Sequence, residues 1–217
     1  MILLILILST VSTLGAFSVG LYALRSLTFE MKIILTYFGV ALLFECASAY
    51  FALHQMKDWY LSHAFTIIEY GLLTAAYSCW QDSHILKKIL VFSIPFFTLL
   101  GIISFYFMED SSHLNTLTRP LSNFLLVVAA AYTLLNLDLE TMKTVFAKPQ
   151  FWVSSASLLY FGTTLILFAS ANSLLRMPDT VAQKYFLLDP LMYIFSNMLY
   201  AGGFLCLDRA RNYSGPS

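Results

Sequence analysis

Seven long apolar stretches dominate this chain and leave it few ways to fold. Each is close to the roughly 20 residues that an α-helix needs to cross about 30 Å of bilayer hydrocarbon. The connectors between them hold the charged and turn-forming residues and are too short for a soluble domain. The sequence therefore predicts a single all-α domain over residues 1–217, a polytopic bundle of seven transmembrane helices. We place these helices at about residues 2–24, 31–53, 59–80, 88–108, 118–136, 151–174 and 185–207.

Composition supports a multi-pass membrane protein. Hydrophobic residues make up 59% of the 217 and charged residues only 11%, and the mean hydropathy is +0.75. A soluble domain carries roughly a quarter charged residues. The sequence contains no basic tract and no nucleic-acid-binding motif, so we expect the lipid bilayer and no nucleic acid among its partners.

The positions of Lys and Arg predict the orientation. The first stretch has no basic residues before it and continues for a full span, so we interpret it as a retained helix and not as a cleaved signal peptide. With the N-terminus outside, eight of the 12 Lys and Arg residues fall on the cytoplasmic side. The other four, Lys57, Arg119, Arg176 and Lys184, fall in outer connectors. Because Lys and Arg accumulate on the cytoplasmic side, this count predicts N-out and C-in.

A weak internal repeat relates two parts of the chain. Tyr37-Phe38-Gly39 in the second helix resembles Tyr160-Phe161-Gly162 in the sixth. The segment FTIIEYG at 65–71 in the third helix resembles FSNMLYA at 195–201 in the seventh. Repeats of this kind are common in transporters. They predict two parallel three-helix units joined by the fourth helix, although the same residue types are frequent in any membrane helix.

Two glutamates, Glu45 and Glu69, lie near the middle of apolar stretches, and the central part of each stretch contains no Lys or Arg. An ionised carboxylate in hydrocarbon is costly, so such a residue is protonated, paired or bound to something. We therefore expect Glu69 to be neutral or paired with a ligand. The alternative is that both are protonated acids that hydrogen-bond to neighbouring helices and only fix the packing.

Other polar residues gather in the half of the bundle that the predicted orientation places outside. Asp189, Tyr193 and Asn197 recur four residues apart and form one stripe of the last helix. On the third helix, His63 and Glu69 belong to a polar arc of roughly 100–120°. These patterns predict an outward-facing polar pocket built from the second, third, sixth and seventh helices. The predicted ligand-binding residues are Glu45, His63, Thr66, Glu69, Tyr70, Tyr160, Asn172, Asp189 and Asn197.

Several of these residues also have a purely structural interpretation. His63 and both asparagines are of the type that hydrogen-bonds between membrane helices. Asp189 precedes Pro190, so it is also suited to capping the first turn of its helix. The sequence leaves these alternatives open.

Motifs for recognisable catalytic chemistry are absent from the sequence. It has no G-x-S-x-G, H-E-x-x-H or P-loop motif, and no lysine deep in the last helix that could hold retinal. The three cysteines have no paired spacing in an outer loop, so we predict no disulfide framework and no metal site. We expect no enzyme and no catalytic residues, and the sequence leaves the cofactor unknown. A membrane hydrolase that uses Glu45 or Glu69 beside His63 is the third alternative, without an evident oxyanion stabiliser.

Several motifs together resemble a known family. The first is the segment 63–70, which contains Glu69, and the second is the buried Glu45. The others are Phe151-Trp152 followed by Leu159-Tyr160-Phe161-Gly162, then Leu167-Phe168, and finally Asn197. In these the chain resembles a family of small bacterial seven-helix membrane proteins. Similar modules form the N-terminal membrane part of some bacterial sensor histidine kinases. The resemblance implies a multi-pass protein of the bacterial inner membrane with a sensory or signalling role.

The leading functional hypothesis is therefore a sensor or receptor-like module that binds an unknown small molecule in the outward-facing pocket. No kinase follows the seventh helix in this sequence, so the signal is expected to pass to a separate partner or through a homodimer. The alternative is a small-solute transporter coupled to protons through Glu45 or Glu69. Sugar transporters with a three-plus-one-plus-three arrangement match in size and repeat. They differ in their prolines, since the interior prolines here are Pro95 and Pro190.

Overall fold

The computed structural model describes residues 2–56, 59–107, 118–137, 145–174, 185 and 187–213, and regular structure in them is helical throughout. The prediction of an all-α protein is confirmed. The predicted helices match the observed ones to within a few residues at most ends, while the last continues past residue 207. The seven long helices are α1 (Ile2–Tyr22), α2 (Phe29–Leu53), α3 (Trp59–Cys79), α4 (His84–Phe107), α5 (Thr118–Leu135), α7 (Pro149–Leu174) and α9 (Leu188–Tyr213).

Five of these helices are long and apolar enough to cross a membrane: α2, α4, α5, α7 and α9. This is typical of a multi-pass membrane protein. In α1 the apolar segment Ile7–Tyr22 is shorter than the segments of these five helices. The remaining helix, α3, carries Ser62, His63, Thr66 and Glu69 in its first half, and such residues lower the hydropathy of a span.

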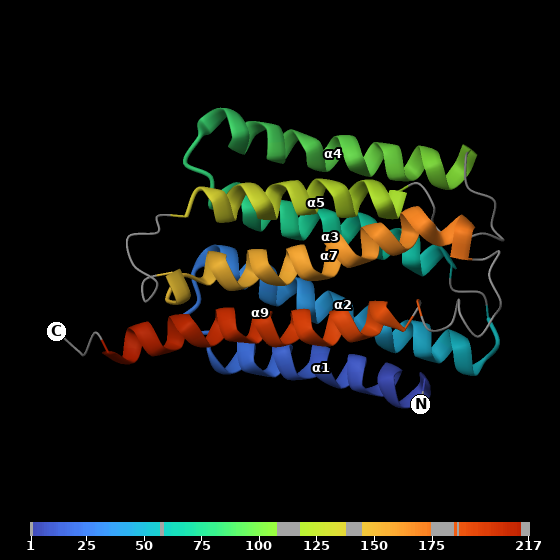
Figure 1. Ribbon diagram of the computed structural model, residues 1–217, viewed down its shortest axis with the longest axis horizontal. Helices are drawn as coiled ribbons and strands as arrows, with labels where there is room; N and C mark the ends of the chain where they lie inside the picture. The colour runs from blue at the N-terminus through green and yellow to red at the C-terminus, as the bar shows by residue number, and fades with distance from the viewer. Residues whose placement is uncertain are drawn as a thin grey trace.

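The helices lie side by side along the long axis of the molecule, with the start of α1 and the end of α9 at opposite ends of the bundle (Figure 1). Six of them pack in a closed order, which we call the six-helix ring: α1 on α2, α2 on α3, α3 on α5, α5 on α7, α7 on α9, and α9 on α1. The remaining helix, α4, packs on the outside of this ring against α3 and, more weakly, α5.

The packing order has a symmetry that bears on the weak repeat. Exchanging α1, α2 and α3 for α5, α7 and α9 turns each contact of the six-helix ring into another contact of the ring. Two parallel three-helix units joined by α4 would pack in this order. The repeat itself remains a prediction.

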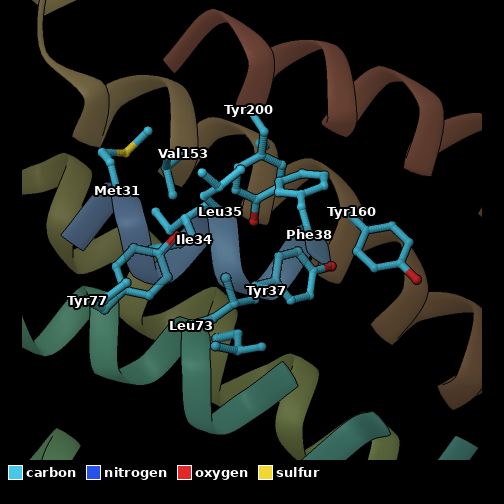
Figure 2. Packing of buried hydrophobic residues seen from close by; sticks show 14 of the residues in the cluster. Met31, Ile34, Leu35, Tyr37, Phe38, Leu73, Tyr77, Val153, Tyr160 and Tyr200 are labelled. Atoms are coloured by element: carbon cyan, nitrogen blue, oxygen red, sulfur yellow. The ribbon is translucent and has the colours of Figure 1, made fainter. Parts of the chain in front are cut away.

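Aromatic side chains fill the middle of the six-helix ring. Phe38 of α2 is fully buried and meets Tyr200 and Phe204 of α9 edge-on, at ring-centroid distances of 5.2 and 6.1 Å. Figure 2 shows Phe38 and Tyr37 on α2 among these core side chains. Close helix contact continues toward one end, where Gly202 of α9 lies directly against the Trp152 ring of α7. Small residues at such crossings let membrane helices approach closely.

Candidate functional site

The centre of the site is a buried ion pair between Glu69 of α3 and Arg119 of α5. Arg119 Nη1 donates to Glu69 Oε2, and the Tyr37 hydroxyl donates to Glu69 Oε1 at 3.2 Å. Arg119 Nη2 donates to the Tyr160 hydroxyl at 3.1 Å. Glu69 is only 1% exposed. These side chains come from α2, α3, α5 and α7, so the pair ties four helices of the six-helix ring together.

The ion pair corrects two expectations. Arg119 was expected in an outer connector, but it lies in the first turn of α5 and is buried. Glu69 was expected to be neutral or paired with a ligand, but its partner is this guanidinium. An arginine cannot lose its proton in a protein, so burying it requires an anion nearby. Glu69 supplies that anion.

A pattern in α5 could have revealed the position of Arg119. The buried residues of α5 are Thr118, Arg119, Ser122, Asn123, Leu126, Ala129, Ala130 and Thr133. They recur at helical spacing and are mostly small or polar, which is how the interior face of a membrane helix differs from its lipid face. Arg119 lies on this stripe. The sequence signal for a buried Arg119 was therefore this stripe of small and polar residues. An interpretation based only on the apolarity of the stretch did not use it.

A second group of polar side chains surrounds Glu45. Its Oε1 atom accepts hydrogen bonds from the hydroxyls of Thr13, at 2.9 Å, and Tyr193, at 3.1 Å. Asn197 donates through Nδ2 to Ser12 Oγ at 2.8 Å and to Thr13 Oγ1 at 3.3 Å. This group therefore joins α1, α2 and α9. The α1 hydroxyls were not among the predicted site residues, because serine and threonine are common in membrane helices.

A cavity of about 320 Å³ lies beside Glu45. It is formed by the N-terminal halves of α1, α3 and α9, the C-terminal half of α2, and the middle of α7. Helices α1, α3 and α9 begin at the end of the bundle where α2 ends, so these parts meet at that end (Figure 1). The lining residues are Ser9, Ala41, Phe44, Glu45, Ser48, Leu61, Ser62, Phe65, Tyr160, Asp189, Pro190 and Tyr193.

Tyr160 connects this cavity to the ion pair. Tyr160 lines the cavity, its ring centroid lies 5.1 Å from that of Tyr193, and its hydroxyl accepts the hydrogen bond from Arg119. Asp189 also lines the cavity, and its Oδ1 accepts a hydrogen bond from Thr164 of α7 at 2.9 Å. A molecule in the cavity would therefore touch a residue that is itself bonded to the buried pair.

The structure brings only part of the predicted residue set to the cavity. Glu45, Tyr160 and Asp189 line it, and Glu69 is reached through Arg119 and Tyr160. Asn197 does not line the cavity in the described residues, and its side chain donates to Ser12 of α1. The four helices predicted to build the pocket all contribute to it, together with α1. Asn172 belongs to the last turn of α7, and its side chain lies outside the described residues.

Three predicted residues of α3 serve other contacts. His63 packs edge-on against Phe105 of α4 at 5.6 Å, and the Tyr70 hydroxyl donates to Ser93 Oγ of α4 at 2.7 Å. Thr66 donates to a backbone carbonyl one turn earlier in α3. His63 and Tyr70 are not among the described lining residues of the cavity, while Ser62 and Phe65 of the same helix are. Successive residues are about 100° apart on a helix, so Glu69 and Tyr70 meet different neighbours.

The described contacts of His63 and of the two carboxylates are with different partners. Among the described residues, no hydrogen bond joins His63 to Glu45 or Glu69, and each carboxylate is bonded to other partners. In the same part of the chain, no cluster of three or more His, Cys, Asp or Glu residues could hold a metal ion.

A second cavity, of about 370 Å³, lies at the opposite end of the bundle. It is lined by the ends of α3 and α5 and the start of α7, including Gln81, Asp82, Thr133, Asn136 and Gln150. Between the two cavities, the Tyr77 hydroxyl donates to Ser157 Oγ, which is also hydrogen-bonded to the Tyr200 hydroxyl, both at 2.8 Å. Polar groups therefore occupy the bundle interior between both cavities.

Comparison with known proteins gives no further assignment. No protein-family model, no curated protein and no solved structure shows significant similarity to this chain.

Proposed function

We propose that this protein is a membrane sensor or receptor-like module that binds a small molecule in the cavity beside Glu45. The observation that carries this proposal is the dual role of Tyr160, which lines the cavity and accepts a hydrogen bond from the buried Arg119. The cavity is at the lower end of the roughly 300–1,000 Å³ that is typical of small-molecule sites. A purely packed bundle would not need such a cavity beside two carboxylates.

The ion pair offers a physical route from ligand to signal. A ligand that contacts Tyr160 or Tyr193 changes the partners of hydroxyls that now bond to Arg119 and Glu45. Those bonds hold the six-helix ring together, so a change in them alters the relative free energies of alternative helix packings. In the proposed arrangement, seven spans cross a bacterial inner membrane with the cavity outside. The signal then passes on the cytoplasmic side to a separate partner or through a homodimer.

Blocking the cavity tests the binding function. Ser48 lines the cavity, so a Ser48→Phe substitution should fill it and abolish ligand retention. Cys46, two residues earlier on α2, is exposed and provides a matched control, Cys46→Phe. Protein in lipid nanodiscs is incubated with a bacterial metabolite extract and analysed by native mass spectrometry. A small molecule retained by wild type and Cys46→Phe but lost from Ser48→Phe supports the proposal. Equal retention by all three overturns it.

A reporter at the C-terminus tests the proposed orientation. The proposal places the N-terminus outside, and an odd number of spans then places the C-terminus in the cytoplasm. Green fluorescent protein fused after Ser217 should be fluorescent, while alkaline phosphatase fused at the same position should be inactive. The reverse pattern would show that the cavity faces the cytoplasm or that the number of spans is even.

The second cavity favours one alternative function, a small-solute transporter. A transporter must expose its site to each side in turn, and here cavities lie at both ends of one bundle with polar groups between them. Purified protein in liposomes distinguishes the two functions. Flux of the retained molecule or of protons would establish transport, whereas saturable binding without flux leaves the sensor function.

A further inference from the structure

We infer that the ligand of the cavity beside Glu45 is a small organic cation of the ammonium class; this rests on the proposed function and specifies its substrate. Two carboxylates, Glu45 of α2 and Asp189 of α9, line the cavity. The described lining contains no Lys, Arg or His. The cavity therefore presents two carboxyl groups that can balance a positive charge on a ligand, and its described lining supplies no cation. The Arg119 guanidinium, which interacts electrostatically with Asp189, is paired with Glu69.

The hydrogen bonds to these carboxylates come from uncharged donors. Thr13 and Tyr193 both donate to Glu45 Oε1, and Thr164 donates to Asp189 Oδ1. Hydroxyl donors orient a carboxylate without neutralising it. Glu45 Oε2 is buried and has no hydrogen-bond partner in the described part of the chain. The contrast with Glu69 is direct, because Glu69 has the Arg119 guanidinium beside it.

Aromatic rings complete the site. Phe44 and Phe65, with ring centroids 5.3 Å apart, and Tyr160 and Tyr193, with ring centroids 5.1 Å apart, all line the cavity. Aromatic rings attract cations through the negative potential of their faces, and rings combined with carboxylates recognise alkylated ammonium groups. A bare divalent ion would instead need six or more oxygen ligands. The mixture of rings and carboxylates therefore fits an organic cation better than a metal ion or an anion.

The test compares three probes of nearly the same shape that differ in charge. Choline carries a quaternary ammonium, 3,3-dimethylbutan-1-ol is its neutral isostere, and 3,3-dimethylbutanoate is an anion of similar bulk. Binding is measured by isothermal titration calorimetry on the full chain in an uncharged maltoside detergent, since phosphatidylcholine would itself present an ammonium group. We expect choline to bind about tenfold or more tightly than the neutral probe, with no binding of the anion.

Two isosteric variants locate the effect. Glu45→Gln and Asp189→Asn each keep the oxygen that accepts the present hydroxyl bonds but remove a charge, so folding should be preserved while choline affinity falls about tenfold or more. Glu30→Gln, on the same helix α2 but at its other end, is the matched control and should bind choline like wild type. Circular dichroism confirms that each variant is folded.

The outcomes separate the ligand class from the function. If the neutral probe binds as tightly as choline and Ser48→Phe abolishes both, the cavity binds small molecules but the cation assignment is overturned. If choline binds equally to wild type, Glu45→Gln and Asp189→Asn, the assignment is overturned as well. If choline does not bind, the ammonium assignment falls. If the metabolite-extract experiment also finds no retained molecule, the proposed binding function is overturned as well.

Discussion

A Glu69→Gln variant should lose about 3–5 kcal/mol of stability, because it leaves the buried Arg119 guanidinium without its anion. Arginine keeps its proton, so the charge cannot be removed to relieve the cost. Arg119→Gln should cost less, since the remaining carboxyl group can take up a proton and still bond to Tyr37. The measurement is reversible unfolding in mixed detergent micelles, followed by circular dichroism.

A double variant separates loss of the pair from loss of packing. Glu69→Gln with Arg119→Gln places two amides where the ions were, so it should be more stable than Glu69→Gln alone. Glu30→Gln, outside the site on α2, should change stability by less than about 0.5 kcal/mol. Equal stability of Glu69→Gln and wild type would show that the ion pair does not hold α3 and α5 together.

A Phe38→Ala variant should lose about 3–5 kcal/mol, because the cavity it leaves lies inside the six-helix ring, where lipid cannot enter. Phe92 of α4 is 72% exposed on the outer surface and provides the control. In Phe92→Ala, lipid chains replace the lost ring contacts, so the loss should be small. The same unfolding assay compares the two variants. Comparable losses at both positions would contradict the placement of α4 outside the ring.

The predicted and the observed site differ in Arg119, because the prediction considered only polar residues in the interior of apolar stretches. Glu45, Tyr160 and Asp189 were all among the predicted site residues, and all three line the cavity. Glu45 was predicted because a carboxylate within an apolar stretch is costly, and Asp189 because it shares a polar stripe with Tyr193 and Asn197. Arg119 was not predicted, because a basic residue at the start of an apolar stretch also fits a connector. The stripe of small and polar residues on α5 was the sequence signal for an inward position, and the structure shows that Arg119 pairs there with Glu69 of the facing helix.

The sequence by itself determined that the chain is helical and where the helices lie, because these depend on local apolarity and length. Five of the seven predicted spans are long and apolar enough to cross a membrane. The sequence did not determine which face of each helix meets which neighbour. His63 and Tyr70 lie within a helical turn or two of Glu69, yet they contact α4 while Glu69 contacts α5. Contacts between distant helices depend on the packing order and on the rotation of each helix about its axis. The pattern of polar residues along a helix limits the inward-facing side only to a broad arc of the helix surface. The tertiary structure alone therefore decided that a buried ion pair lies beside the cavity.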